Sequence, residues 1–382
     1  ILISTTTRVF DRTATEYLYE SKNNWCFFSQ KSYITWRKPI FNETYEQGSE
    51  SHRNLHFQGC MINHSDDLTI NLNIVFFGSP VYSSRVLSYL LSSKHSVKAV
   101  VTQDVKLDKK KRELKTPVGI FSEKNNLRTL YPLNLDDSRF IAELESLNAD
   151  VFLIYAYGKI LPPDIIKLPK YGVINLHCSL LPRWRGAAPI QRALLNRDDV
   201  TGVTFFKIDE HLDTGNILSS YEYSIKDEDD SLSLQDKLTD LAIQNIENIL
   251  QPNLNNKKLT PQNDSLATYA KKLSKDESII DWNEDAETII SKVKAFAGWP
   301  GVQAELFDVK FKIHKAIYSN DITQYSPGSV IKFDHDKFEI KAKKGSIQIT
   351  KLQLPGKNII TCKDLYNSNS DFSTKIKSYS VK

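Results

Sequence analysis

Short apolar runs alternate with helical patterns through the middle of the chain. The apolar runs, which are typical of strands, lie at 73–77, 97–102, 150–156, 172–176 and 201–208, and helical patterns lie at 83–91, 117–126 and 136–148. Uninterrupted apolar strands separated by helices are typical of a parallel sheet with both faces covered. The pattern therefore predicts an α/β fold over residues 71–250, with a Rossmann-like, open and mostly parallel sheet.

The hydrophobic pattern changes after residue 250. Residues 251–268 are polar and contain proline, which indicates a linker. Beyond it, one helical pattern at 286–296 precedes strand patterns at 303–307, 311–316, 328–333, 338–342 and 346–354. Short strands at this spacing predict a small, OB-like β-barrel in a C-terminal domain over residues 269–382. We expect Trp299, in a turn next to Pro300, to fill the core of that domain.

Residues 1–70 show neither the helical nor the strand pattern of hydrophobic positions. They are rich in Ser, Thr, Asn and aromatic residues, and Met61 is the only methionine of the chain. Two interpretations compete: a targeting or lineage-specific extension, or a leader upstream of a start at Met61. Six acidic residues before position 51 argue against a mitochondrial transit peptide, because such peptides are poor in acids. We expect a poorly structured N-terminal extension or leader.

The composition is that of an ordinary folded protein. Of 382 residues, 40% are hydrophobic and 25% are charged, which excludes a collagen-like or disordered chain as a whole. No apolar run reaches the roughly 18 residues that a membrane-spanning helix needs, so we expect no membrane partner. The four cysteines are scattered without the spacing of a zinc site, and we expect no metal.

The net charge of +4 is unevenly distributed. Residues 310–382 hold 14 Lys against 6 Asp and Glu, a net charge of +8. Residues 106–115 (KLDKKKRELK) hold six basic and two acidic residues. A basic region is either a solvated face or the electrostatic footprint of a polyanion, and composition leaves both interpretations open.

The first predicted strand is followed by Gly78-Ser79-Pro80. The Gly-x-Gly-x-x-Gly fingerprint of dinucleotide-binding folds is absent, and Pro80 lacks the N–H that a pyrophosphate would use. A nicotinamide-dependent dehydrogenase is therefore disfavoured. We expect Pro80 as the first residue of the next helix and Ser79 as its cap.

Candidate chemistry concentrates at 172–186 (GVINLHCSLLPRWRG). Asn175 and His177 are two residues apart at the end of a predicted strand, so both side chains face one side of the sheet. A carboxamide and an imidazole that both donate to the same oxygen atom of a ligand can stabilise an oxyanion. Alternatively, both residues only end the strand by hydrogen bonds to the local backbone. Cys178 points to the opposite face and no Gly-x-Ser-x-Gly elbow exists, which disfavours a covalent acyl-enzyme.

Asp213 is the third candidate. It follows the strand pattern at 201–208 in a Leu-Asp-Thr-Gly turn, from which it could return to the edge that holds Asn175 and His177. The alternative is an Asx-turn without a chemical role. If the three side chains converge, they form an acyl-transfer site that needs no nucleophile.

Several long blocks carry a resemblance to a known family. They are IVFFGSP, AYGKILP, INLHCSLLPRWRGAAPIQRALL, TGVTFFKIDEHLDTGNIL and ATYAKKLSKDESIIDW. Together they resemble the folate-dependent formyltransferases, and among them most the methionyl-tRNA formyltransferases. The resemblance leaves residues 1–70 outside. It implies that the formyl group of 10-formyltetrahydrofolate passes to the α-amine of methionine on the initiator tRNA, for translation initiation.

The resemblance also implies which residues act. The catalytic residues fall on Asn175, His177 and Asp213: the first two stabilise the oxyanion that forms when the amine attacks the formyl carbon, and Asp213 orients His177. The folate-binding residues fall on Tyr157, Gly158, Ile160, Leu161, Ser179, Leu180, Leu181 and Pro182. The tRNA-binding residues fall on Lys106, Lys109, Lys110, Lys111 and Arg112, and in the C-terminal domain on Lys341, Lys343 and Lys344. Arg183 and Arg185 either position acidic groups or pin their loop.

Two other functions remain candidates. A related formyltransferase could act on a small amine, such as a purine precursor or a nucleotide sugar, and an inactive homologue could only bind RNA. The basic segments favour tRNA over a small amine, and the complete Asn-His-Asp set favours an enzyme. We expect a monomer in the bacterial cytosol, with the mitochondrial matrix or another organelle as the alternative.

Overall fold

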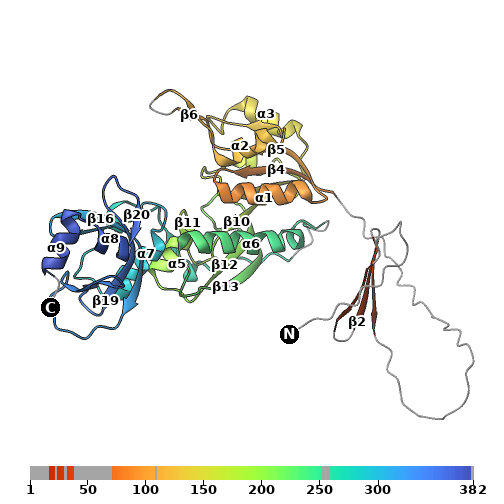
Figure 1. Ribbon diagram of the computed structural model, residues 1–382. Coiled ribbons are helices and arrows are strands. Elements are labelled where there is room, and N and C mark those ends of the chain that lie inside the picture. Colours follow the sequence, from red (N-terminus) through yellow and green to blue (C-terminus); the bar gives the residue numbers. More distant parts are fainter. Residues whose placement is uncertain are drawn as a thin grey trace, which may run out of the picture. The chain divides into compact units, whose positions relative to one another are not determined.

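The computed structural model describes residues 17–21, 24–29, 32–37, 71–107, 110–251, 254 and 258–379. The chain divides into two compact units, residues 1–66 and 67–382. In the first, β1 (Tyr17–Ser21), β2 (Asn24–Ser29) and β3 (Ser32–Arg37) form an antiparallel sheet (Figure 1). Their aromatic and β-branched residues favour extended backbone, and the rest of the segment predicted to be poorly structured lies outside the described residues.

The second unit begins with a seven-stranded sheet in the order β13-β12-β10-β9-β4-β5-β8. Its strands are β4 (Asn73–Gly78), β5 (Ser96–Val101), β8 (Thr129–Leu130), β9 (Val151–Tyr155), β10 (Val173–His177), β12 (Val200–Lys207) and β13 (Ile217–Ser224). The five strands from β10 to β8 are parallel, whereas β12 and β13 are antiparallel to their neighbours. The predicted mostly parallel α/β sheet is confirmed.

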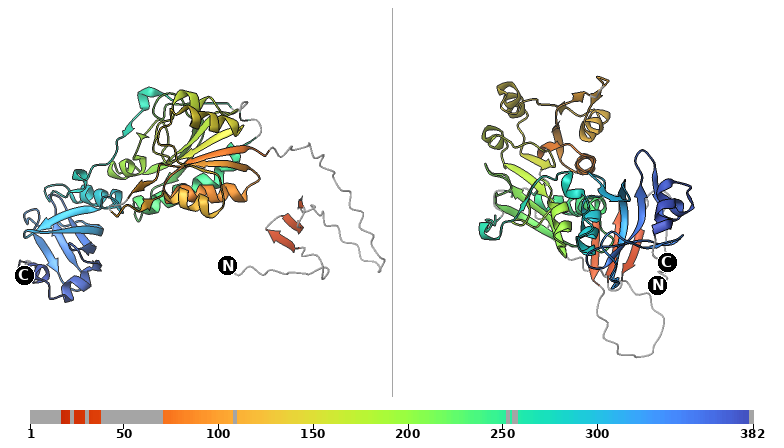
Figure 2. Two further views of the ribbon diagram at one scale, coloured as in Figure 1. Left: turned by 90° about the horizontal axis from the view of Figure 1, so that it is seen from above. Right: turned by 90° about the vertical axis from the view of Figure 1, so that its left-hand side faces the viewer.

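Helices cover both faces of this sheet (Figure 2). One core lies under α1 (Val81–Ser92), α2 (Pro117–Lys124), α5 (Pro189–Leu195) and α6 (Ser231–Ile249). The other lies under α3 (Ser138–Ser146) and α4 (Pro163–Ile166). Strands β4, β9, β10 and β12 are buried on both sides along most of their length, which is why their sequences are apolar without alternation, whereas the edge strand β13 is partly exposed and alternates.

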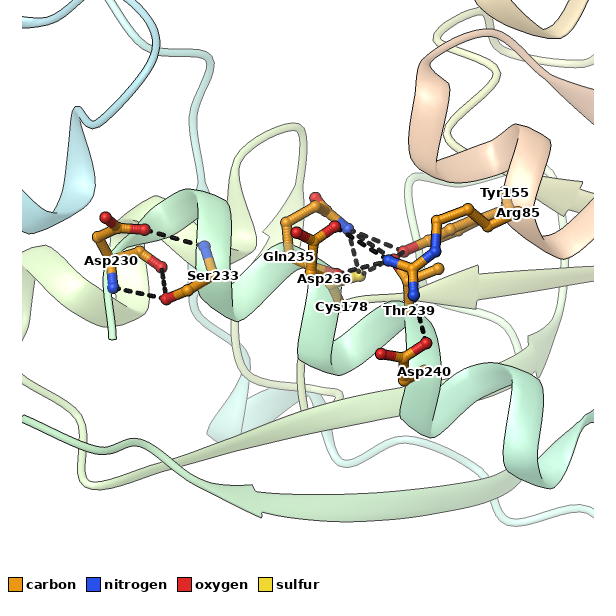
Figure 3. A network of polar contacts seen from close by, with 9 residues as sticks. All are labelled: Arg85, Tyr155, Cys178, Asp230, Ser233, Gln235, Asp236, Thr239 and Asp240. Carbon is orange, nitrogen blue, oxygen red and sulfur yellow. Dashed lines mark hydrogen bonds and ion pairs between the residues drawn. The ribbon is translucent and has the colours of Figure 1, made fainter. Parts of the chain in front are cut away.

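The long helix α6 was absent from the predicted elements. It begins with a capping box between Asp230 and Ser233, and Leu234, Leu238 and Ala242 along one face are fully buried. This spacing of four residues is a helical signal. Arg85 on α1 pairs with Asp236 and Asp240 on α6, which fastens the two helices side by side (Figure 3).

The start of α1 differs from the prediction by one residue. Pro80 precedes the helix as its N-cap, and the cap makes no side-chain hydrogen bond. Ser79 does not cap the helix, because its hydroxyl donates instead to the carbonyl oxygen of Tyr157, at 3.1 Å. Ser79 thus links the end of β4 to the segment that follows β9.

Within this second unit, the seven-stranded sheet and its helices form the first domain, and a second domain follows the linker. Its sheet has the order β15-β16-β19-β18-β17, with β20 paired to β19, and all these pairs are antiparallel. The strands are β15 (Val302–Leu306), β16 (Val309–Ser319), β17 (Val330–Phe333), β18 (Phe338–Lys341), β19 (Ser346–Gln353) and β20 (Ile359–Thr361). The predicted antiparallel β-domain is present. Among the described strands, no pairing joins the end strands β15 and β17 of this sheet.

The core of this domain is built by helices as well as strands. It lies between the sheet and α7 (Ala286–Ala295), α8 (Cys362–Asn367) and α9 (Asp371–Tyr379). The prediction for Trp299 is wrong, because its side chain is 54% exposed. Phe296, three residues earlier, is fully buried in the core in its place.

The linker is itself bonded to the first domain. It contains the short 3-10 turn η1 (Asp264–Leu266), and a second turn, η2 (Asp276–Ser278), follows after its end. Between them β14 (Tyr269–Ala270) pairs in parallel with β11 (Arg185–Gly186), and Thr260 bridges to Ile217 at the start of β13. The described part of the predicted linker from Thr260 onward is therefore bonded to the first domain.

Packing under α6 generates a prediction about stability. Leu238→Ala removes a fully buried side chain from the first core and leaves a cavity, so we expect a loss of about 3 kcal/mol in the free energy of unfolding. Leu133→Ala makes the same chemical change at a residue that is 84% exposed, where we expect about 0.5 kcal/mol or less. Urea unfolding measures both; equal losses would contradict the assignment of this core.

Candidate active site

A cavity of about 750 Å³ opens where three neighbouring parallel strands end. Its lining comes from Ser79 and Pro80 after β4, residues 155–161 after β9, and Asn175 to Cys178 at the end of β10. A loop at 208–213 completes the wall. The carboxyl ends of parallel strands are where ligands bind in open α/β sheets, and the volume suits an organic ligand.

The end of β10 sends alternate side chains to opposite faces. Asn175, His177 and Cys178 all line the cavity, but His177 lies beside Asp213, whereas the Cys178 thiol contacts Tyr155 and Gln235 in the layer under α6 (Figure 3). Burial raises the pKa of the Cys178 thiol, so it stays protonated at neutral pH and is a poor nucleophile. The predicted separation of His177 from Cys178 by strand parity is what the structure has.

Two different groups hold His177, whose residue exposure is only 6%. Its Nε2 lies 2.8 Å from the carbonyl oxygen of Trp184, which can only accept, so Nε2 carries a hydrogen. Its Nδ1 lies 3.6 Å from Oδ2 of Asp213, which is beyond a direct hydrogen bond. The short contact that orients the ring therefore comes from Trp184, a residue that the sequence did not indicate.

Asp213 reaches His177 through the loop that follows β12. Strand β12 is antiparallel to β10, with His177 opposite Thr204 and Ile174 opposite Lys207. Its last residue thus lies at the beginning of β10, away from the cavity edge. The loop 208–216 brings the chain back, and Asp213 adopts a left-handed φ of 55° there. Its Oδ2 accepts a hydrogen bond of 2.8 Å from the Gly186 amide.

The loop after β10 is pinned by two arginines. Arg183 donates to both carboxylate oxygens of Asp198, at 2.9 and 2.6 Å, and the Trp184 indole donates to the same carboxylate. Arg185 is 2% exposed and donates to Gln262 and Asp264 of the linker. Of the two interpretations left open for these arginines, the contacts support the pinning of the loop.

The eight predicted folate-binding residues fall into two groups. Tyr157, Gly158, Ile160 and Leu161 line the cavity, whereas the four residues Ser179, Leu180, Leu181 and Pro182 do not. The second group packs behind the site: the Ser179 hydroxyl donates to the Arg183 carbonyl oxygen, and the Leu181 amide donates to Thr204.

The segment after β9 is positioned by contacts to its backbone. The carbonyl oxygen of Tyr157 accepts from Ser79 and from Gln103, the latter at 2.8 Å. Gly158 has a φ of 84°, and a Cβ there would meet the Gln103 amide at 2.5 Å. Burial, with Asp104 nearby, raises the pKa of Tyr157 well above its usual range, so its phenol stays neutral.

The predicted basic residues differ in exposure. Lys106 and the run Lys110, Lys111 and Arg112 are exposed in a hairpin of β6 (Lys106–Leu107) and β7 (Glu113–Leu114), which projects from the first domain in Figure 1; Lys109 lies outside the described residues. Lys343 and Lys344 are exposed in the second domain. Lys341 is 5% exposed and pairs with Asp321 at 2.9 Å, so this prediction is corrected: its ammonium is not available to a phosphate.

The residues that the structure describes hold neither a candidate metal centre nor a membrane-spanning helix. No group of three or more His, Cys, Asp and Glu side chains among them could hold a metal ion. None of the helices in the described part of the chain is long and apolar enough to cross a membrane.

The chain matches known sequence families over both domains. Residues 72–250 match the formyl transferase family, and residues 272–370 match the formyl transferase C-terminal domain. A methionyl-tRNA formyltransferase of Legionella pneumophila is 35% identical over 299 residues, which are 78% of this chain and 95% of the relative. The chain belongs to the formyltransferase family.

Two solved structures support the fold of this formyltransferase. HypX from Aquifex aeolicus, in complex with tetrahydrofolic acid, is 17% identical with a TM-score of 0.56 over 78% of this chain; the match spans 47% of HypX. WlaRD, a sugar 3N-formyl transferase, is 20% identical with a TM-score of 0.54, over 76% of this chain and all of WlaRD. At these identities the likeness concerns the fold alone.

Sequence reasoning missed the residues that hold the site in place. The Trp184 carbonyl and the Gly186 amide contact His177 and Asp213 through the backbone, which leaves no trace in residue type. Gln103 and Gln262 act through side chains from distant segments. The Pro- and Gly-broken, apolar stretch 179–189 was the one available signal, because such a composition suits a loop packed over a site.

The Asp198 carboxylate generates a prediction about pH. Burial opposes its ionisation, but hydrogen bonds from Arg183, Trp184 and Asn196 outweigh burial and lower its pKa. A lowered pKa stabilises the fold above the unfolded-state value of about 4 and loses this effect as the pH falls through the folded value. We expect Asp198→Asn to destabilise the formyltransferase at pH 7, with a smaller loss below about pH 4. Urea unfolding across this range measures it; a loss independent of pH would contradict the assignment.

Proposed function

We propose that this chain transfers the formyl group of 10-formyltetrahydrofolate to the α-amine of methionine on the charged initiator tRNA. The observation that carries the proposal is the meeting of Asn175, His177 and Asp213 at one cavity. Amide, imidazole and carboxylate around one acyl group suit formyl transfer without a covalent intermediate. The match to 95% of a methionyl-tRNA formyltransferase favours this acceptor over a purine precursor or a nucleotide sugar.

The cavity suits a folate in size and in lining. Its 750 Å³ lies within the range of roughly 300–1,000 Å³ that organic ligands occupy. Apolar side chains of Ile154, Leu161 and Ile208 form walls for a flat ring system, and backbone groups of residues 156–161 supply polar partners. When bound there, the co-substrate supplies the activated one-carbon group; the four cavity-lining residues Tyr157, Gly158, Ile160 and Leu161 would hold it.

Asn175 supplies an uncharged donor for the oxyanion. Its side chain lines the cavity and has no hydrogen-bond partner in the described part of the chain, so its amide is available to a ligand. A preorganised donor of this kind contributes roughly 3 kcal/mol to transition-state stabilisation in acyl transfer.

His177 is the residue that accepts the proton released by the amine. Since Nε2 is committed to the Trp184 carbonyl, Nδ1 is the nitrogen that receives a proton from the attacking amine. The Asp213 carboxylate, 3.6 Å away, stabilises the imidazolium that results. Protonated Nδ1 donates a hydrogen bond to the oxyanion beside Asn175. As the oxyanion collapses, the bond from the formyl carbon to the folate nitrogen breaks, and the proton on Nδ1 passes to that departing nitrogen.

The tRNA would bind along two exposed basic segments. They are the hairpin residues Lys106, Lys110, Lys111 and Arg112, and Lys343 and Lys344 in the second domain. Lysines contact a phosphate backbone as point charges and read shape rather than sequence. We propose further that the chain acts as a monomer, in the bacterial cytosol or in an organelle that has its own translation.

Catalysis can be tested by truncation of the two donors. We expect Asn175→Ala and His177→Ala each to lower kcat for formylation of methionyl-tRNA by about 10²–10³-fold, because each removes a group that acts on developing charge. Folate binding, measured by fluorescence titration, should change little. Asn367→Ala and His335→Ala make the same changes at exposed positions of the second domain and serve as controls. Full activity in both active-site variants would refute the proposal.

The basic surface can be tested by salt dependence. We expect the affinity for charged tRNA to fall steeply with salt, and the double variant Lys343→Ala/Lys344→Ala to lower the slope of log K against log salt by about 1–2. Lys98→Ala/Lys124→Ala removes two exposed lysines outside both basic segments and is the matched control. A slope that is flat, or equal in all three proteins, would count against this surface.

A further inference from the structure

We propose that Gln262 of the linker is a positioning residue that sets the place of Asp213 beside His177, and so couples the linker to formyl transfer. The inference rests on the proposed function, because its effect is on that reaction. Gln262 lies outside the cavity lining and 49 residues from Asp213 in the chain.

The Gln262 side chain bonds to both loops of the site at once. Its Oε1 accepts from Nε and Nη2 of the buried Arg185, at 3.0 and 2.8 Å. Its Nε2 donates to the carbonyl oxygens of Asp213 and Gly215, at 2.9 and 2.8 Å. These four hydrogen bonds use both amide hydrogens and both lone pairs, so the group is fully satisfied.

The chemistry of these partners admits only an amide. A guanidinium donates and needs an acceptor, whereas two carbonyl oxygens accept and need a donor. The orientation of the amide follows, because the flipped group would set Nε2 against Arg185 and Oε1 against the two carbonyls. A carboxylate at this position would keep the Arg185 contact and place an oxygen against two oxygens.

Both groups that Gln262 contacts are connected to Asp213, which lies beside His177. On one side, Gln262 holds the backbone of Asp213, which turns at a left-handed φ of 55°. On the other side, it holds Arg185, whose neighbour Gly186 donates to the Asp213 carboxylate. Gln262 therefore positions both the backbone of Asp213 and the Gly186 amide that bonds to the Asp213 carboxylate.

The same segment leads on along the chain to the second domain. Beyond Gln262, Thr268 bonds to the backbone amides of Trp184 and Arg185, and β14 pairs with β11. A displacement of the linker when the second domain engages its partner would reach the Trp184 carbonyl and the Asp213 carboxylate together. The Trp184 carbonyl orients the His177 ring directly, and the Asp213 carboxylate lies 3.6 Å from its Nδ1.

The test uses Gln262→Glu in the full-length chain. This change keeps the acceptor for Arg185 and removes the donor to the Asp213 loop, so we expect kcat for formylation to fall about 100-fold, the effect of a displacement near 1 Å at the chemistry. KM for charged tRNA and the midpoint of urea unfolding should stay near those of the unsubstituted chain. Asn263→Asp is the matched control, because it makes the same amide-to-acid change one residue along and keeps the Oδ1 that accepts from Ser265.

A second readout does not depend on activity. Hydrogen–deuterium exchange in the segment 208–216 should be faster in Gln262→Glu and unchanged in Asn263→Asp. Unchanged exchange, a kcat within two-fold of the original, or a rise in KM alone would overturn the role of Gln262. An unsubstituted chain that fails to formylate charged tRNA would instead refute the proposed function, and the exchange result would still decide whether Gln262 holds the Asp213 loop.

Discussion

A guanidinium that is taken out of water must find partners, and this requirement at Arg185 shapes the site. The residue is 2% exposed and lies in the loop that follows β10. Its partners, Gln262 and Asp264, come from the linker to the second domain. An unpaired charge at this depth would cost several kcal/mol, so loop and linker are obliged to meet. The Trp184 carbonyl and the Gly186 amide, on either side of Arg185, are placed by the same contact.

The chemistry then depends on backbone groups as much as on side chains. His177 is oriented by a carbonyl oxygen and Asp213 by an amide hydrogen, and both come from residues 184–186. Backbone groups on a pinned loop do not change rotamer, which suits a site that has to hold geometry closely. Nδ1 of His177 and Oδ2 of Asp213 lie 3.6 Å apart.

The lysines of the second domain differ in burial. Lys341 ends a strand with its ammonium turned to Asp321, whereas Lys343 and Lys344 stand in the following turn and are exposed. Three lysines within four positions therefore have different roles, one in the fold and two on the surface. Two neighbouring aromatic residues differ in the same way, because the Phe296 side chain is buried in the core and the Trp299 side chain is exposed.

The sequence alone determined the class of fold and the pairing of Asn175 with His177. Apolar strands between helices predict a covered parallel sheet, and a period of two sets the faces of neighbouring strand residues without reference to the rest of the molecule. Only the tertiary structure decided how Asp213 arrives, because β12 is antiparallel to β10 and a loop must return the chain to the site. The burial of Lys341, the exposure of Trp299 and the bonds of Gln262 were decided there too. The partners of Lys341 and Gln262 lie at least 20 residues away in the chain, and neither residue type nor local period records which distant group a side chain will meet.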